Sequence, residues 1–320
     1  MVSEVEERIH HALKSHPLER IEHGYRLVHP GSVGVSTLRL LPVNEIRKDL
    51  PVVAIAEMVA EYRSTGTPAF TPVGIQRLNG MAVHGAYEIR NGILRQTAQF
   101  SLVSNEPDAH LVAQTVLNAF GGQLPIGLST VLAAASAAAL KQQQAHHAMP
   151  RRWQKPLAEA SLQAATAMLS ERGLAASNDL HAVWAEFPLS GTCPSRSIDP
   201  NAETALLRMD VGKPHPIAGA GYYSTIALPL TSPPADSAEM CRRLNAIELE
   251  QSHFAPRLGA WGLHGPQGFP GYSCFIPCAE PNERLPMAAM WWSVLRAAWI
   301  RDRVWRPQPG AAGEPESPRA

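Results

Sequence analysis

Cysteine side chains are the first residues in this chain that could carry chemistry. Cys274 and Cys278 are separated by three residues, which would suit half of a metal site. No second pair of Cys or His at ligand spacing completes four ligands, so the sequence predicts no metal ion. We interpret Cys193, Cys241, Cys274 and Cys278 as reduced, small, buried side chains.

The histidines do not complete a site either. His146 and His147 are adjacent, and adjacent residues of a helix point about 100° apart, so they cannot share a metal ion. A Ser or Cys nucleophile needs a base within hydrogen-bond reach, and no sequence spacing places a His beside the stretch 190–193 or beside Cys274. We therefore predict no catalytic residue. His264, between two glycines, is the first candidate if an activity exists.

A glycine-rich stretch at 219–224 superficially resembles a phosphate-binding loop. It leads into a predicted strand at 225–230, whereas a loop that holds phosphate opens a helix. We interpret it as the start of a strand and expect no cofactor.

Composition limits the kinds of partner. The chain has 28 basic and 28 acidic residues, so no net charge attracts nucleic acid or anionic lipid. The apolar stretch 124–140 is short for a membrane span of about 20 residues and contains Pro and Gly, so a buried helix is favoured. Residues 1–16 are rich in Glu and His and do not resemble a secretory signal. These features predict a cytoplasmic protein without nucleic-acid or membrane partners.

Hydrophobic periodicity predicts the elements of the first half. Asn91-Gly92 lies between two alternating runs, as a two-residue type I′ turn requires, because both turn residues take positive φ. The remaining predictions are strands at 25–28 and 33–41, and helices at 4–16, at 49–63, from Asn105 to Gly121-Gly122 and at 130–146.

The second half gives a clearer pattern. We predict helices at 156–172, 236–251 and 283–304, and strands at 180–189, 204–211, 219–230, 258–264 and 271–277.

A weak internal echo divides the chain. The segment from Ser104 to Ala119 recurs 127 residues later, from Thr231 to Ala246, which predicts two tandem modules with Leu117 and Leu244 in equivalent buried positions. At 320 residues the chain also exceeds the usual size of one core. We predict modules at 1–150 and 151–306 and a disordered tail at 307–320.

The predicted order α-β-β-β-α-β-β-α in the second module carries a resemblance. Together with Leu244-Asn245, Glu248, Gly259-Ala260-Trp261, Phe275-Ile276-Pro277, Trp292, Arg296-Ala297 and Trp299, it resembles the bacterial type III secretion chaperones and the YbjN-like proteins. The resemblance covers about 156–305 well and 69–147 loosely. It implies an α/β fold of the α+β type, two tandem modules with an antiparallel sheet and flanking helices in each, and binding of a protein client in place of catalysis.

The aromatic residues near the carboxyl end fit a packing or binding role. We predict that Trp261 packs on the last helix near Leu295 or Trp299. The candidate partner-binding residues are Trp261, His264, Trp291, Trp292 and Trp299.

Two functions follow from these observations. The first is a chaperone-like or adaptor protein that forms an internal pseudo-dimer and is monomeric, with the helices 130–146 and 283–304 in contact. The alternative is an enzyme of unknown class with a pocket between the modules near the loop 262–272.

Overall fold

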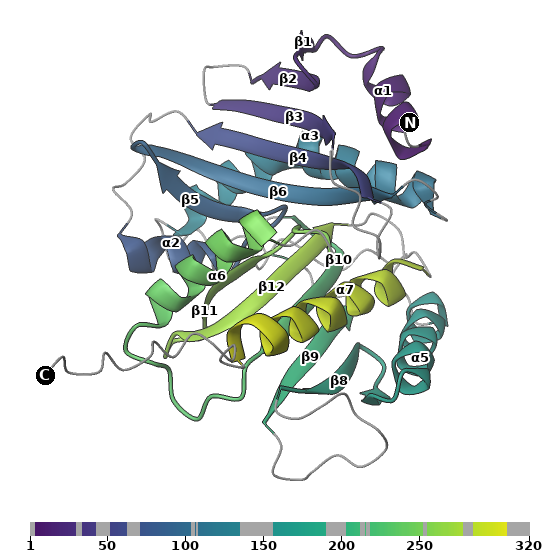
Figure 1. The fold of residues 1–320 in the computed structure, drawn as a ribbon, viewed down its shortest axis with the longest axis vertical. Coiled ribbons are helices and arrows are strands. Elements are labelled where there is room, and N and C mark those ends of the chain that lie inside the picture. The colour runs from purple at the N-terminus through teal and green to yellow at the C-terminus, as the bar shows by residue number, and fades with distance from the viewer. Residues whose placement is uncertain are drawn as a thin grey trace, which may run out of the picture.

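The computed structural model contains two six-stranded antiparallel sheets with helices packed on them (Figure 1). This confirms the predicted α/β fold with two modules. The structure describes residues 4–29, 34–42, 52–62, 71–103, 106, 108–134, 156–189, 203–211, 215, 218–251, 255–277 and 284–305. Among these residues, no helix is both long and apolar enough to cross a membrane. The proposed module boundary near residue 150 and the tail at 307–320 lie outside the described residues and stay predictions.

The first sheet has the strand order β1-β2-β3-β4-β6-β5. Helix α3 packs on β3, β4 and β6, and α1 packs on α3. The elements are α1 (Glu4–Leu13), β1 (Glu19–Ile21), β2 (Gly24–Val28), β3 (Gly34–Pro42), β4 (Val52–Tyr62), α2 (Pro72–Asn79), β5 (Ala86–Arg90), β6 (Ile93–Val103) and α3 (Ala109–Ala134).

The second sheet has the order β7-β8-β9-β10-β12-β11, which is the same arrangement. Helix α7 packs on β9 and β10, and α5 packs on α7. The elements are α5 (Pro156–Glu171), β7 (Ala175–Asn178), β8 (Ala182–Pro188), β9 (Thr204–Val211), β10 (Gly221–Ala227), α6 (Ser237–Gln251), β11 (Ala260–His264), β12 (Phe269–Pro277) and α7 (Arg284–Ile300), followed by a π-helical turn, Arg301–Trp305. Sequence reasoning missed β7 because this short edge strand is largely exposed.

The predicted hairpin is confirmed. Asn91 and Gly92 have φ of 52° and 75°, and the flanking residues Arg90 and Ile93 pair across the turn.

The helix predicted at 49–63 is wrong, because Val52–Tyr62 forms β4 in the interior of the first sheet. Its burial alternates, with Ala54, Ala56 and Met58 facing the core. Alanine and glutamate favour helices in isolation, but pairing with β3 and β6 on both sides decides the conformation.

The predicted helix end at Gly121-Gly122 is also wrong. Helix α3 continues through both glycines and through Pro125 to Ala134. The helix lies close to the sheet: a Cβ on Gly127 would stand 1.8 Å from the hydroxyl of Tyr62. Glycine here permits close packing on β4 and does not end the helix. The predicted helix at 130–146 is described only as far as Ala134, where it is the last turn of α3.

The internal echo aligned the wrong helices. Leu117 lies on α3 and is partly buried, whereas Leu244 lies on α6, the middle helix of the second half. The residue that matches Leu244 is Leu78 on α2. Leu78 is 1% exposed and Leu244 is 2% exposed. The predicted equivalence of Leu117 and Leu244 is therefore contradicted.

The asparagine after each of these leucines makes the same contacts. Asn79 accepts from the backbone N–H of Tyr87 and donates to its carbonyl, at 2.6 and 3.1 Å. Asn245 does the same with Trp261, at 3.0 and 2.8 Å. Tyr87 and Trp261 are each the second residue of the following strand. The two halves are thus built alike around one side-chain clamp between helix and strand.

The two halves meet along a junction, which we define as the contact of α2, β5 and β6 with α6, β11 and β12. Helix α2 packs on β11 and α6. The backbone N–H groups of Gly85, Gln99 and Arg257 donate to the carbonyls of Leu258, Arg257 and Gln99, at 2.9, 3.1 and 2.7 Å. One connected cluster of buried apolar side chains includes residues of both halves.

The predicted contact between helices 130–146 and 283–304 stays a prediction, and the structure shows which other elements join the halves. The junction is built by α2, β5, β6, α6, β11 and β12, and α7 adds an edge-on contact between Trp292 and Phe100 of β6, with ring centroids 5.6 Å apart. The remainder of the Ala-rich segment, 135–146, lies outside the described residues.

Close backbone approach at the junction gives a first prediction. A Cβ on Gly262 would lie 2.1 Å from the backbone nitrogen of Gly80, so Gly262→Ala should lower the free energy of unfolding by about 1–3 kcal/mol. The control is Gly121→Ala, where a Cβ meets nothing within 4 Å and helix propensity should raise stability slightly. Urea denaturation measures both, and an unchanged midpoint for Gly262→Ala would contradict the described contact.

Candidate functional site

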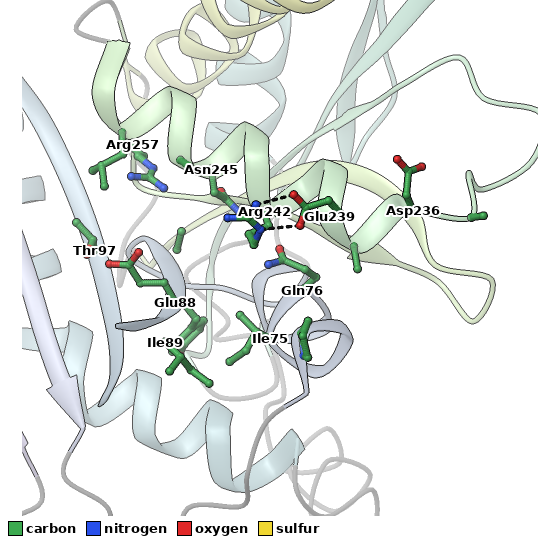
Figure 2. A pocket seen from close by; sticks show the side chains of 17 residues that line it. Ile75, Gln76, Glu88, Ile89, Thr97, Asp236, Glu239, Arg242, Asn245 and Arg257 are labelled. Carbon is green, nitrogen blue, oxygen red and sulfur yellow. Dashed lines mark hydrogen bonds and ion pairs between the residues drawn. The ribbon is translucent and has the colours of Figure 1, made fainter. Parts of the chain in front are cut away.

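A cavity of about 540 Å³ opens at the junction, and we call it the junction pocket (Figure 2). Helix α2 and strands β5 and β6 line it from the first half, and α6 and Arg257 line it from the second. Its apolar lining consists of Pro72, Ile75, Ala86, Ile89, Ala235, Ala238, Ala246 and Leu249.

The pocket arises where the two halves depart from each other in packing. Helix α2 packs directly on β11, with Gly80 against Gly262. The corresponding pair is α6 and β5, which make far less contact with each other, and both elements line the pocket. An arrangement that is closed on one side of the junction is therefore open on the other.

Charged side chains sit at several points of the pocket. Arg242 and Glu239 form an exposed ion pair on α6, with a distance of 2.6 Å from Nε to Oε2. Glu88 projects from β5, and Asp236 precedes α6. Arg257 is the buried member, since it is only 4% exposed.

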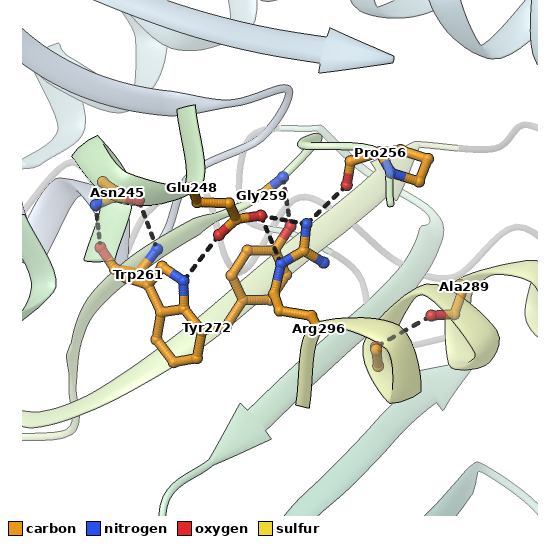
Figure 3. A network of polar contacts seen from close by, with 9 residues as sticks. Asn245, Glu248, Pro256, Gly259, Trp261, Tyr272, Ala289 and Arg296 are labelled. Carbon is orange, nitrogen blue, oxygen red and sulfur yellow. Dashed lines mark hydrogen bonds and ion pairs between the residues drawn. The ribbon is translucent and has the colours of Figure 1, made fainter. Parts of the chain in front are cut away.

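A buried polar network lies behind the pocket (Figure 3). The carboxylate of Glu248 accepts from Arg296 Nε at 2.7 Å and from Trp261 Nε1 at 2.9 Å. The Arg296 guanidinium also donates to the Pro256 carbonyl at 2.9 Å and lies 3.9 Å from the ring centre of Tyr272. The network joins α6, α7 and the segment that carries Arg257.

Electrostatics favour the charged form of Arg296. Burial disfavours the charge on Arg296, but Glu248 and Tyr272 outweigh it and raise the pKa of Arg296 above its ordinary value. The pair is completely enclosed, so removing one member would leave the other as an uncompensated buried charge.

The predicted partner-binding residues lie in several places, and none lines the junction pocket. Trp261 is fully buried, with its ring beside Tyr272 at 5.5 Å. It donates to Glu248 of α6, and Arg296 of the last helix donates to the same carboxylate. Trp261 and Trp299 belong to one cluster of buried apolar side chains, and direct packing of Trp261 on Leu295 or Trp299 stays a prediction.

The other four predicted residues are half-buried or buried. Trp291 lies under the guanidinium of Arg172, Trp292 contacts Phe100, and Trp299 is buried. His264 forms a hydrogen bond of 3.2 Å with the Gly271 carbonyl within its own hairpin, and burial lowers its pKa. No residue of the loop 262–272, the predicted pocket mouth, lines the junction pocket. Whether any of these residues binds a partner stays a prediction.

Cys241 and Cys274 are buried, and burial raises the pKa of each thiol to about 12. Such thiols are unreactive at neutral pH. In the described part of the chain, no group of three or more His, Cys, Asp and Glu side chains could hold a metal ion. Cys193, Cys278 and the pair His146-His147 lie outside the described residues.

Sequence reasoning missed the residues that shape the pocket. Arg257 stands alone as a charge among the buried residues 255–261. A lone arginine in an apolar run that leads into a strand is the signal that could have indicated it. Asn245, Glu248 and Arg296 entered the sequence analysis as parts of a family pattern, and Trp261 also as a packing residue. The structure shows that these four residues form one connected set of contacts.

The comparisons with known proteins add no identity. No protein-family model matches the chain, and searches of curated proteins and of solved structures returned no significant match.

The buried pair gives the second prediction. Arg296→Met should lower the free energy of unfolding by about 3–5 kcal/mol, because Glu248 would lose its cation while remaining buried. Arg242→Met is the matched control: its pair with Glu239 is exposed, so the change should cost less than about 1 kcal/mol. Equal losses of unfolding free energy in the two variants, measured by chemical denaturation, would show that the Glu248–Arg296 network does not stabilise the segment that carries Arg257.

A buried histidine gives the third prediction. His84 lies at the junction beside His215, and burial, aided by that neighbour, lowers the pKa of His84 to about 4. The unfolded chain therefore binds a proton at higher pH than the folded protein does. The contribution to stability is complete above pH 6.5 and falls by about 3 kcal/mol as the pH falls to 4.

The test measures the free energy of unfolding from pH 7.5 to 4. His84→Asn keeps a residue that tolerates the positive φ of 64° and should flatten this dependence, whereas His181→Asn at an exposed turn should retain the wild-type slope. A slope unchanged in His84→Asn would assign the pH dependence to other groups.

Proposed function

We propose that this chain binds another polypeptide, as a chaperone-like or adaptor protein in the cytoplasm, and that part of the client lies in the junction pocket. The observation that carries the proposal is the separation of α6 from β5, where the corresponding α2 and β11 are in contact. It leaves an apolar wall with charges at fixed points, which is the lining of a specific binding site.

The two halves act as an internal pseudo-dimer under this proposal. Their common element order, common strand order and the paired clamps of Asn79 and Asn245 support an origin by duplication. The resemblance to type III secretion chaperones agrees with such a role. Because the junction already covers the paired faces, we expect the protein to be monomeric.

The size and lining of the pocket suit an extended segment. A volume of about 540 Å³ is within the range of ligand sites and accommodates a few side chains. Apolar side chains from two helices and one strand supply contact area, and the surrounding charges select which residues enter.

The fourth prediction places a photo-crosslinking amino acid at Ile89, an exposed pocket residue of β5. In the native cell it should capture one client in stoichiometric amount. The control is Val28 on β2, which is about as exposed as Ile89 and lies outside the pocket. Capture of the same proteins from both positions would contradict a client site in the pocket.

The identified client then allows a binding measurement. Ala246→Trp fills the pocket from α6 and should lower the affinity for the client by at least about tenfold. Arg243→Trp, at an exposed position of the same helix outside the lining, should bind as the wild type does. Equal affinities for the two variants would reject the proposed site.

A further inference from the structure

Arg257 is held in place by both halves of the molecule. Its backbone N–H and carbonyl pair with Gln99 of β6, and the preceding carbonyl, that of Pro256, accepts from Arg296 of α7. Figure 2 shows the side chain at one end of the junction pocket, on the side of Asn245 and Glu88. The backbone that carries Arg257 is therefore fixed before any ligand enters.

The guanidinium lacks the partners that a buried arginine requires. Its Nε and Nη1 atoms are buried, and neither has a hydrogen-bond partner in the structure as described. Glu248, a fully buried carboxylate that attracts Arg257, is already bonded to Arg296 and Trp261. An isolated buried charge costs several kcal/mol, and arginine cannot escape by losing its proton at neutral pH.

The electrostatic surroundings agree with this geometry. Burial lowers the pKa of Arg257, and Glu248, Tyr272 and Glu88 offset that effect only in part. Attraction from these groups is present, but no described carboxylate forms an ion pair with Arg257.

We propose that Arg257 binds a carboxylate of the client segment, from an Asp or Glu side chain or from its C-terminus, while neighbouring apolar residues pack on Ile75, Ile89 and Leu249. The inference rests on the proposed function in that it assigns the pocket to a client. A carboxylate would give the guanidinium the acceptor that it lacks.

The charges around the pocket favour a single negative charge. Glu88, Asp236 and Glu239 belong to the lining, and Arg242 is already paired with Glu239. A phosphate dianion would meet repulsion from these carboxylates, whereas a carboxylate brings only the charge that Arg257 neutralises.

The first arm of the test separates a binding role from a structural one. If Arg257 is kept for a ligand, Arg257→Met removes an unpaired buried charge, so the midpoint of unfolding should stay the same or rise. A large fall in the midpoint would show that Arg257 is a structural ion partner and would overturn the inference.

The second arm uses small probes and needs no client. In a titration followed by the NMR signals of arginine Nε–H groups, 3-phenylpropanoate should shift the signal of Arg257, and 3-phenylpropanamide should not. Followed by the backbone amide signals of the pocket residues, Arg257→Met should weaken binding of 3-phenylpropanoate by about 10- to 100-fold. Arg243→Met, at an exposed position of α6 outside the lining, should retain binding. Equal responses to acid and amide, equal losses in both variants, or tighter binding of inorganic phosphate would each overturn the inference.

The third arm uses the client captured from Ile89. Replacing the pocket-bound Asp or Glu of the client by Asn or Gln should weaken its binding to the wild-type protein by about 10- to 100-fold. The same replacement should change its affinity for Arg257→Met little. A captured client with no such coupling would leave the proposed function standing and reject the carboxylate assignment. Probe binding without any captured client would reject the assignment to a client segment.

Discussion

The backbone pairing of Gln99 with Arg257, together with the hydrogen bond from Gly85 to Leu258, is the constraint on which the rest of the structure depends. These bonds join the inner strand β6 and the loop before β5 to the segment before β11. They set the depth at which α2 meets β11 and thereby the gap between α6 and β5. The junction pocket follows from this pairing, because its two walls belong to different halves.

Two buried arginines beside the pocket differ in their partners. Arg296 has Glu248, the Pro256 carbonyl and the face of Tyr272, so its charge is fully compensated. Arg257 is fixed through its backbone and its side chain lacks comparable contacts. The contacts of Arg296 stabilise the fold. The unpaired guanidinium of Arg257 stays able to bind a ligand and lowers the stability of the fold. Such residues are typical of sites whose partner is absent.

Local signals were sufficient for much of the fold. Helices and strands of the second half have clear periodicity and punctuation, and the Asn91-Gly92 hairpin depends on two residues alone. Strand β4 and the full length of α3 were mispredicted because sheet pairing and close packing on Tyr62 override local propensity. The true internal correspondence, Leu78-Asn79 with Leu244-Asn245, is too short to find by sequence and becomes evident through the shared contacts. The pocket could not be predicted, because its walls are brought together only by the junction.

Native-state hydrogen exchange tests the central claim that the junction makes the two halves one cooperative unit. The amides of Gly85, Gln99 and Arg257, which donate across the junction, should exchange only through global unfolding, with the same denaturant dependence as the amides of β4. Exchange of these three amides through a smaller opening, while β4 stays protected, would show that the halves separate independently and would contradict a preformed pocket.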